Sequence, residues 1–311
     1  MALTLVRNRG TTGIETDLQP IKSDLSALAL REATNESSSA FNLPNQFIDT
    51  LTNANNLGTQ TNGVLGSGYW ATDFVALTSH AGNATPITDG SYTVLKWIST
   101  SGTNNIILGA DMVVDYLVVG GGGGAGGSEG NFTAGGGGGA GGYRASGFGP
   151  SPLQGSALNL SLGSYAVTVG AGGAAPSAAS GNSSSLSTIS STGGGGGGNY
   201  PTASPSAAGR PGGSGGGATR CTNFSGGSGN AGGFNPPEGN DGGKGANVSP
   251  DNNDFGGSGG GATAAASDGG NGGAGAPNAI TGTDTTYAGG GGGSSRKNQP
   301  VGKSGGAGGG G

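Results

Sequence analysis

The sequence has few of the residues from which catalytic and metal sites are built. It contains one histidine, His80, and one cysteine, Cys221. A single cysteine excludes an intrachain disulfide framework and any multi-thiolate metal site, and a single histidine excludes a multi-histidine site. We therefore expect no metal, no cofactor and no enzyme activity.

Charge is also scarce, since only 9% of residues are charged and the net charge is −5. Nucleic-acid binders and proteins of anionic membranes need basic patches, so neither class is expected. No stretch approaches 18 consecutive apolar residues, and the first residues lack the pattern of a secretion signal. The chain is expected to enter no membrane and to leave its cell by lysis.

Glycine is abundant instead, with 77 residues, of which only 10 precede Gly120. The apolar run Met112–Val119, typical of a strand, continues directly into the glycine run 120–127. Residues 162–173 repeat this design, because Tyr165, Val167 and Val169 alternate with smaller or polar residues before glycine returns. Such runs are either a disordered linker or packed polyproline-II helices with three residues per turn. The strands and the low charge favour packing.

The N-terminal part predicts a short helix. Leu18, Ile21, Leu25 and Leu28 recur at helical spacing, which suits either a small oligomerising bundle or one helix lying on its own domain. An apolar knot containing Phe41, Pro44 and Phe47 follows, and we assign these seven residues to docking or oligomerisation.

Strands are predicted at 91–97, 105–108 and 112–119, with a turn at 101–103. The expected fold class is mainly β, a small antiparallel β-sandwich or jelly-roll-like core that carries glycine-rich polyproline-II helices. The expected domains are a docking segment at 1–50, a polar linker or small β-region at 51–90, and a glycine-rich domain at 91–311.

Two segments resemble proteins of bacterial viruses. The segment LALREATNESSSAFNLPNQFID (residues 28–49) is similar to one near the N-terminus of structural proteins from marine short-tailed phages, including cyanophages. The strings VVDYLVVGGGGGAGG, AGGGGGAGGYRA, SYAVTVGAGG and NSSSLSTISSTGGGGGG resemble the glycine-rich domain of phage tail-fibre and other virion proteins, over most of residues 91–311. Members of that family close with a short apolar strand that this sequence lacks, so the domain is expected to be incomplete at its C-terminus.

Several local motifs match only in part. The Gly-x-Gly-x-x-Gly match in 120–127 has no helix former after it, which argues against a dinucleotide site. Residues Asp251–Asp254 could bind calcium but are more typical of a turn. His80 is expected in a surface loop.

Isolated aromatic residues interrupt the glycine runs. They either pin the glycine helices to neighbouring structure or form a receptor-contact surface, because aromatic faces stack on sugar rings. The candidate receptor contacts are Tyr200, Phe224, Phe234, Phe255 and Tyr287.

The resemblances imply a non-enzymatic virion structural protein, a tail fibre or similar appendage that assembles in the host cytoplasm. The implied partners are further copies in a homotrimer, other virion proteins, and a host cell-surface glycan or protein. Three alternatives remain: a capsid-mounted fibre or decoration protein, a fibre-borne glycan depolymerase, and a packed-polyglycine structural or ice-binding protein.

Overall fold

The computed structural model describes residues 3–8, 77–89, 92–127, 134–199, 207–220, 223–246, 254–296 and 302–310. Residues 1–9 and 77–311 belong to one compact unit, and residues 10–76 belong to a second. The predicted helix and the docking residues Leu18, Ile21, Leu25, Leu28, Phe41, Pro44 and Phe47 lie outside the described residues.

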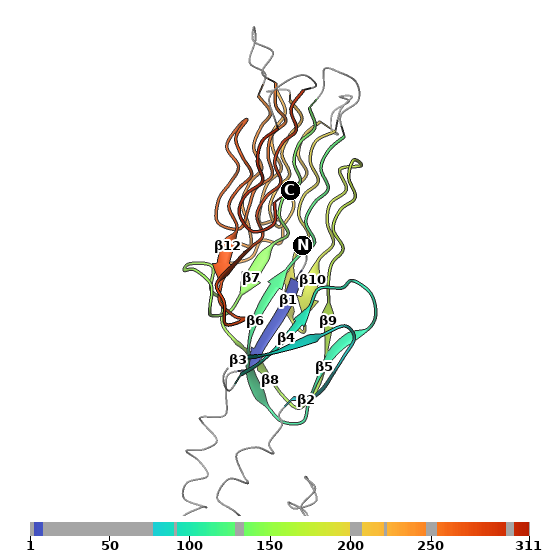
Figure 1. Ribbon diagram of the computed structural model, residues 1–311, viewed down its shortest axis with the longest axis vertical. Coiled ribbons are helices and arrows are strands. Elements are labelled where there is room, and N and C mark those ends of the chain that lie inside the picture. Colours follow the sequence, from blue (N-terminus) through green and yellow to red (C-terminus); the bar gives the residue numbers. More distant parts are fainter. Residues whose placement is uncertain are drawn as a thin grey trace, which may run out of the picture. The chain divides into compact units, whose positions relative to one another are not determined.

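The described part of the chain is mainly β, with antiparallel sheets and no helix, as the sequence predicts (Figure 1). The first sheet has the strand order β3-β4-β1-β6-β7, and β8 also pairs with β6. Its strands are β1 (Leu3–Asn8), β3 (Thr85–Asp89), β4 (Tyr92–Trp97), β6 (Met112–Val119), β7 (Tyr143–Ala145) and β8 (Leu158–Leu160).

The second sheet has the order β11-β10-β9-β5-β2, and a separate hairpin pairs β12 with β13. The bounds are β2 (Leu77–Ala81), β5 (Asn104–Leu108), β9 (Gly163–Thr168), β10 (Ser184–Leu186), β11 (Ile189–Ser191), β12 (Ala276–Asn278) and β13 (Thr285–Tyr287). The strands predicted around 91–97, 105–108 and 112–119 are confirmed as β4, β5 and β6. His80 lies in β2, opposite Ile106 of β5, so its expected place in a loop is wrong.

Strand β6 is apolar on both faces because both faces are covered. Val114, Tyr116 and Val118 belong to a core that β6 shares with Ile106 of β5 and with other residues of the second sheet. Leu117 and Val119 belong to a different core that includes residues of the β12–β13 hairpin. The run Met112–Val119 therefore lacks the alternation of a strand with one solvated face.

Asp115 is the buried exception in β6, with 1% of its surface exposed. The Ser146 hydroxyl donates to Asp115 Oδ1 at 2.8 Å, and the Tyr116 N–H donates to Ser146 Oγ at 2.9 Å. Hydrogen bonding of this kind offsets part of the cost of burying a carboxylate.

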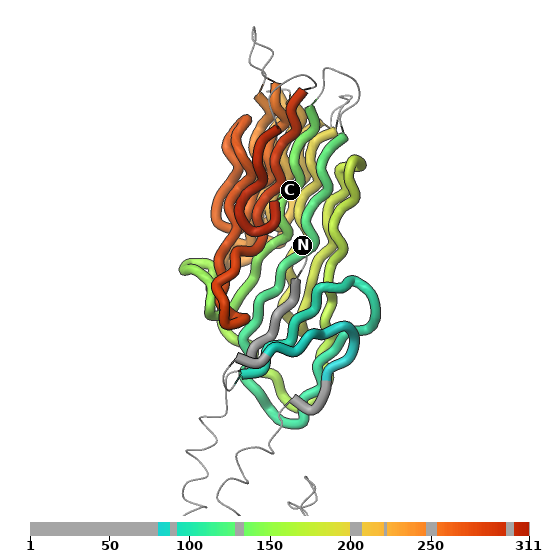
Figure 2. Tube along the Cα trace, in the orientation of Figure 1, coloured from blue at the N-terminus to red at the C-terminus, as the bar shows by residue number. Residues whose placement is uncertain are grey.

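Beyond the sheets, extended glycine segments run side by side, joined by backbone hydrogen bonds (Figures 1 and 2). The bonds recur every third residue: Gly120 donates to Gly142 at 3.0 Å, Gly123 to Gly139 at 2.9 Å and Gly126 to Gly136 at 2.8 Å. Segments 120–127 and 134–142 are thus antiparallel neighbours. These runs are therefore packed against one another rather than extending as a free linker.

Segment 134–142, which we call the central segment, is buried along its whole length. It exchanges backbone hydrogen bonds with five other segments: 120–127, 192–199, 213–220, 254–261 and 288–296. This arrangement leaves no room for side chains on the faces that meet. A Cβ on Gly138 would lie 2.0 Å from the carbonyl oxygen of Gly123, and one on Gly136 would lie 2.0 Å from that of Gly217.

The first prediction compares two glycines of neighbouring segments. We expect Gly138→Ala to lower the free energy of unfolding by about 1–3 kcal/mol or more, because the methyl group collides with a backbone that cannot move independently. At Gly122 the nearest atom to an added Cβ, the carbonyl oxygen of Gly139, is 3.9 Å away. We expect Gly122→Ala to change stability by less than about 0.5 kcal/mol. Denaturant unfolding of both variants checks this, and equal losses would contradict the packing.

The second prediction concerns Tyr143, whose hydroxyl accepts a hydrogen bond from Asn278 Nδ2 at 2.8 Å. Burial raises the pKa of Tyr143 to about 12. An unfolded tyrosine titrates near pH ~10, so between these values the unfolded chain loses a proton that the folded chain keeps, and stability falls as pH rises.

The variant Tyr143→Phe removes this titration. At neutral pH we expect it to be less stable than the wild type by about 1 kcal/mol, because Asn278 loses its partner. Unfolding measured from pH ~7 to ~12 should show the difference shrink above pH ~10. A difference that stays constant over this range would show that Tyr143 is not the group responsible.

Candidate functional site

The glycine segments alternate in direction, so the bundle has two distinct ends. One end joins the sheets, where segment 120–127 leaves β6 and the central segment enters β7. We call the other end the sheet-distal end. Five described segments stop there, at Gly127, Asn199, Arg220, Ala246 and Arg296. The described chain resumes after each of them, in the same order, at Ala134, Ala207, Asn223, Asp254 and Gly302. Lateral bonds such as Gly198 to Gly217 at 2.8 Å and Gly256 to Ser294 at 2.9 Å hold these segments at one level. All five connections therefore leave and return at the same end.

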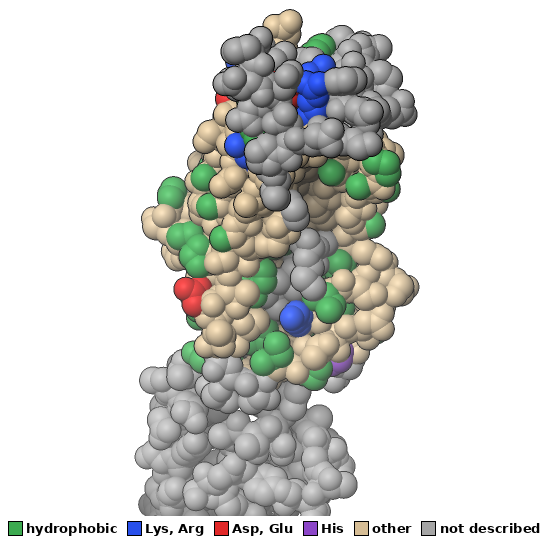
Figure 3. Space-filling model, turned by 45° about the horizontal axis from the view of Figure 1, so that its top comes forward, with side chains coloured by type: hydrophobic (Ala, Val, Ile, Leu, Met, Phe, Trp, Pro, Cys, Tyr) green, Lys and Arg blue, Asp and Glu red, His purple; other side chains and the backbone are tan. Residues whose placement is uncertain are grey.

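A charged cluster lies at the sheet-distal end. Asp254 Oδ2 is 2.7 Å from Arg220 Nη1 and 3.7 Å from Arg296 Nη1. Lys and Arg side chains are visible near this end in Figure 3. The Asp254 side chain is only 4% exposed, so this pair is screened less than a surface ion pair. The cluster joins three separate segments of the bundle.

Phe255 packs beside this cluster. It forms backbone bridges with Ala246 and Ser295, and its residue surface is 8% exposed. Lys303 Nζ lies 4.0 Å from the centre of its ring, within the range of a cation–π interaction. This aromatic residue therefore pins neighbouring segments together as well as lying near the end surface.

Polar side chains at the same end satisfy backbone groups. Asn199 Oδ1 accepts a hydrogen bond from the Gly127 N–H at 2.7 Å, and Ser294 Oγ accepts one from the Gly135 N–H at 2.7 Å. These bonds fix the segment ends from which the connections depart. The arrangement brings both ends of five connections to one hydrogen-bonded surface of the bundle.

The five candidate receptor contacts are not brought together. Phe224, which is partly buried, and Phe255 lie at the sheet-distal end, and Tyr200 lies outside the described residues, next to Asn199. Phe234 and Tyr287 lie at the end that joins the sheets. The Phe234 ring is 4.1 Å from Arg144 Cζ, and Tyr287 of β13 packs against the core that contains Leu117.

Sequence reasoning missed the cluster of Arg220, Asp254 and Arg296. These residues are far apart in the sequence and show no spacing pattern, so only their meeting at one end of the bundle reveals them. The part of Asp251–Asp254 that the structure describes is Asp254, and its carboxylate pairs with arginine.

The glycine match in 120–127 has a packing role. The N–H groups of Gly120, Gly121, Gly123, Gly124 and Gly126 all donate to neighbouring segments. These N–H groups therefore already donate to backbone carbonyls of other segments. Among the described residues, no group of three or more His, Cys, Asp or Glu side chains could hold a metal ion. The described residues also contain no helix long and apolar enough to cross a membrane.

The fold defines this protein as an antiparallel β protein whose sheets continue into a bundle of extended glycine segments. A family model described as a glycine-rich domain matches residues 98–311, and the chain belongs to this family. No curated protein and no solved structure matches the sequence.

The third prediction tests the charged cluster. Asp254→Asn keeps the shape of the side chain but removes the charge that pairs with Arg220, and we expect a loss of about 1–3 kcal/mol in the free energy of unfolding. The control is Asp268→Asn, because Asp268 is exposed and accepts a hydrogen bond from the Lys244 N–H that an amide oxygen can also accept. Similar losses in both variants, measured by thermal unfolding, would mean that the cluster does not stabilise this end.

Proposed function

We propose that this protein is a virion structural protein, a tail fibre or a comparable appendage, which docks through residues 10–50, the N-terminal part that follows β1, and presents the sheet-distal end to the host surface. The observation that carries the proposal is the convergence of five chain connections at one end of a closely bonded bundle. The resemblance of residues 28–49 to phage structural proteins supports it.

The sequence of the five connections fits attachment. Residues 128–133, 200–206, 221–222, 247–253 and 297–301 contain no Gly-Gly pair and include asparagine, serine and aromatic residues. Asparagine side chains bind hydroxyl groups, and aromatic faces stack on sugar rings. A host cell-surface glycan or protein is therefore the proposed ligand.

Multivalent binding allows contacts that are individually weak to hold a particle on a host cell. Once one copy on a particle has bound, the other copies are held close to the same cell surface. The combined affinity of the particle therefore far exceeds that of a single site. A homotrimer, which the resemblance to fibres implies, would place three sheet-distal ends on each appendage. The proposal also covers a fibre that is mounted on the capsid and presents the same sheet-distal end to the host.

We also infer that the glycine segments are polyproline-II helices on a jelly-roll-like sandwich. Hydrogen bonds to a given neighbour recur every third residue, which matches a helix of three residues per turn without internal hydrogen bonds. A crystal structure should give φ near about −75° and ψ near about +145° in these segments. Values typical of β-strands would contradict the inference.

The fourth prediction tests attachment. We expect Tyr200→Ala and Phe224→Ala, made separately in the full chain, to reduce binding to host cells by about tenfold, since stacking on one aromatic ring is worth about 0.5–1.5 kcal/mol at each site and a multivalent contact loses it at every copy. Binding of the labelled protein to a panel of marine cyanobacteria, measured by flow cytometry, checks this.

The matched control is Phe234→Ala, because Phe234 lies at the end of the bundle that joins the sheets. We expect this variant to bind as the wild type does. If Phe234→Ala abolishes binding while Tyr200→Ala does not, the sheet-distal end is not the attachment surface. Cryo-electron microscopy of phage particles that contain this protein tests the virion assignment separately.

A further inference from the structure

One long stretch of the chain carries no charge. Residues 145–209, between Arg144 and Arg210, contain no Asp, Glu, Lys, Arg or His. The stretch includes β8, β9, β10 and β11 and the extended segments that follow β9 and β11. In a typical soluble domain about 25% of residues are charged, and most of these lie on the surface. A stretch of this length without charge needs no explanation where it is buried, but part of it is exposed.

Strand β9 exposes one face of this stretch. Its residues Tyr165 and Val167 pack on the core that contains Ile106. Successive side chains of a strand point to opposite faces. The exposed residues on the other face of β9 are Ser164, Ala166 and Thr168. The outer face of β9 therefore carries only small, uncharged side chains.

Two larger apolar side chains adjoin these small ones. Leu162, just before β9, is 67% exposed. Ile107 of β5 lies opposite Ser164 and is 36% exposed. Asp111 lies at one end of this surface, where its Oδ1 accepts a hydrogen bond from the Leu162 N–H at 2.9 Å. The surface is thus apolar beside its small polar residues, with a carboxylate at its margin.

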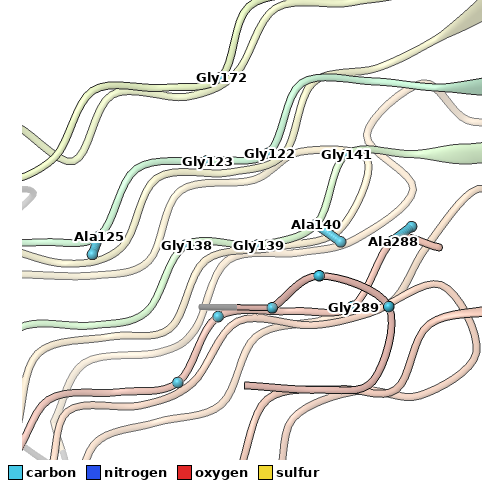
Figure 4. Close-up of a pocket in the computed structure, with 15 residues that line it drawn as sticks. Gly122, Gly123, Ala125, Gly138, Gly139, Ala140, Gly141, Gly172, Ala288 and Gly289 are labelled. Atoms are coloured by element: carbon cyan, nitrogen blue, oxygen red, sulfur yellow. The ribbon is translucent and has the colours of Figure 1, made fainter. Parts of the chain in front are cut away.

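The exposed surface continues from β9 into the bundle. Segment 170–177 follows β9 and lies at the outer edge of the bundle (Figure 2). Its inner side meets segment 120–127, because the Gly173 N–H donates to the Gly122 carbonyl at 2.8 Å, and Figure 4 shows Gly172 on the segment next to Gly122. The exposed residues of this segment are Gly172, Ala174, Ala175, Pro176 and Ser177. We call the exposed residues of 162–177, together with Ile107, the uncharged strip.

The uncharged strip is large enough for a protein contact. Residues 162–177 are extended and span about 50 Å, and three neighbouring strands are about 15 Å wide. The strip then offers on the order of 700 Å² per copy, close to the ~800 Å² that each partner contributes to a standard interface.

The composition of the strip restricts its partner. Its exposed residues include no aromatic ring that could stack on a sugar, because Tyr165 packs on the core. They include no charge that could pair with a strongly charged partner. Exposed surface of several hundred Å² that is largely apolar marks an interaction site. The partner that fits is another protein surface of small, uncharged residues.

A second copy of this chain meets these requirements. The chain has a net charge of −5, so copies that approach through charged surfaces bring an excess of acidic groups together. Two uncharged strips can meet without that repulsion. Small side chains also allow two flat faces to approach closely and interdigitate, as identical faces do in stacked sheets.

We propose that the uncharged strip is the surface through which copies of this chain pack side by side in the appendage. The inference rests on the proposed function, because a fibre is built from several copies. It assigns the contact between copies to the outer face of β9 and to segment 170–177, along the side of the bundle.

The fifth prediction concerns the assembly of the full-length chain. We expect the wild type to sediment with the mass of three chains. Ala166 in β9 and Ala174 in the bundle are both exposed, and we expect Ala166→Arg and Ala174→Arg, made separately, to raise the dissociation constant of the oligomer at least about tenfold. Each variant would bury a charge without a partner in the contact between copies. Sedimentation equilibrium over a range of protein concentrations checks this.

The matched control is Ala265→Arg. Ala265 is also exposed but lies outside the uncharged stretch, so this variant should assemble as the wild type does. A second measurement needs no variant. Deuterium exchange of fragments from residues 162–177 should slow when the protein concentration rises above the dissociation constant, whereas exchange of fragments from residues 263–268 should not change.

Three results would overturn the proposal. The wild type could sediment as a single chain at every concentration. The oligomer could persist unchanged in both arginine variants, or Ala265→Arg could weaken it equally. A single-chain mass combined with a lower free energy of unfolding in both arginine variants would show that residues 10–76 of the same chain cover the strip.

The measurement of cell binding separates this inference from the proposed attachment. A single-chain wild type whose binding to cells still falls in Tyr200→Ala would refute the uncharged strip alone. An oligomer that dissociates in the arginine variants, but binds cells normally in both Tyr200→Ala and Phe224→Ala, would refute attachment through the sheet-distal end alone.

Discussion

The close approach of one backbone to another is the constraint on which this structure depends. The central segment meets five neighbours through hydrogen bonds between main-chain groups, and an added Cβ at most of its positions would lie about 2 Å from a carbonyl oxygen. Such contacts are available only to glycine. Ordering glycine costs more conformational entropy than ordering any other residue. The bundle offsets that cost by pairing N–H and C=O groups in several directions, and the two sheets anchor one of its ends.

The sheets and the bundle belong to one compact unit but are stabilised by different interactions. In the sheets, apolar side chains on both faces of β6 build two cores, so stability comes from buried hydrocarbon. In the bundle, there is little hydrocarbon to bury, and polar side chains complete the backbone bonding instead, within the bundle at Ser258 and also at its ends. Asp254 joins two arginines there, and Asn199 and Ser294 complete the backbone bonding. Chemistry is thereby concentrated at the sheet-distal end and excluded from most of the interior.

This division bears on the proposed attachment. The connections that meet at the sheet-distal end are varied in sequence, unlike the glycine runs between them, which is typical of segments that carry binding functions.

The strands β4, β5, β6 and β9 and the two-part character of the chain can be predicted from the sequence. The apolar run of β6 and the alternation of Tyr165, Val167 and Val169 are local patterns, and local patterns are visible without knowledge of the fold. Tertiary structure alone decided the direction of each glycine segment, the identity of the central segment and the meeting of Arg220, Asp254 and Arg296. It also separated Phe234 and Tyr287 from Phe255, which sequence reasoning had placed in one group. The physical reason is that runs of glycine carry no side-chain pattern, so their neighbours depend on hydrogen bonds between residues far apart in the chain.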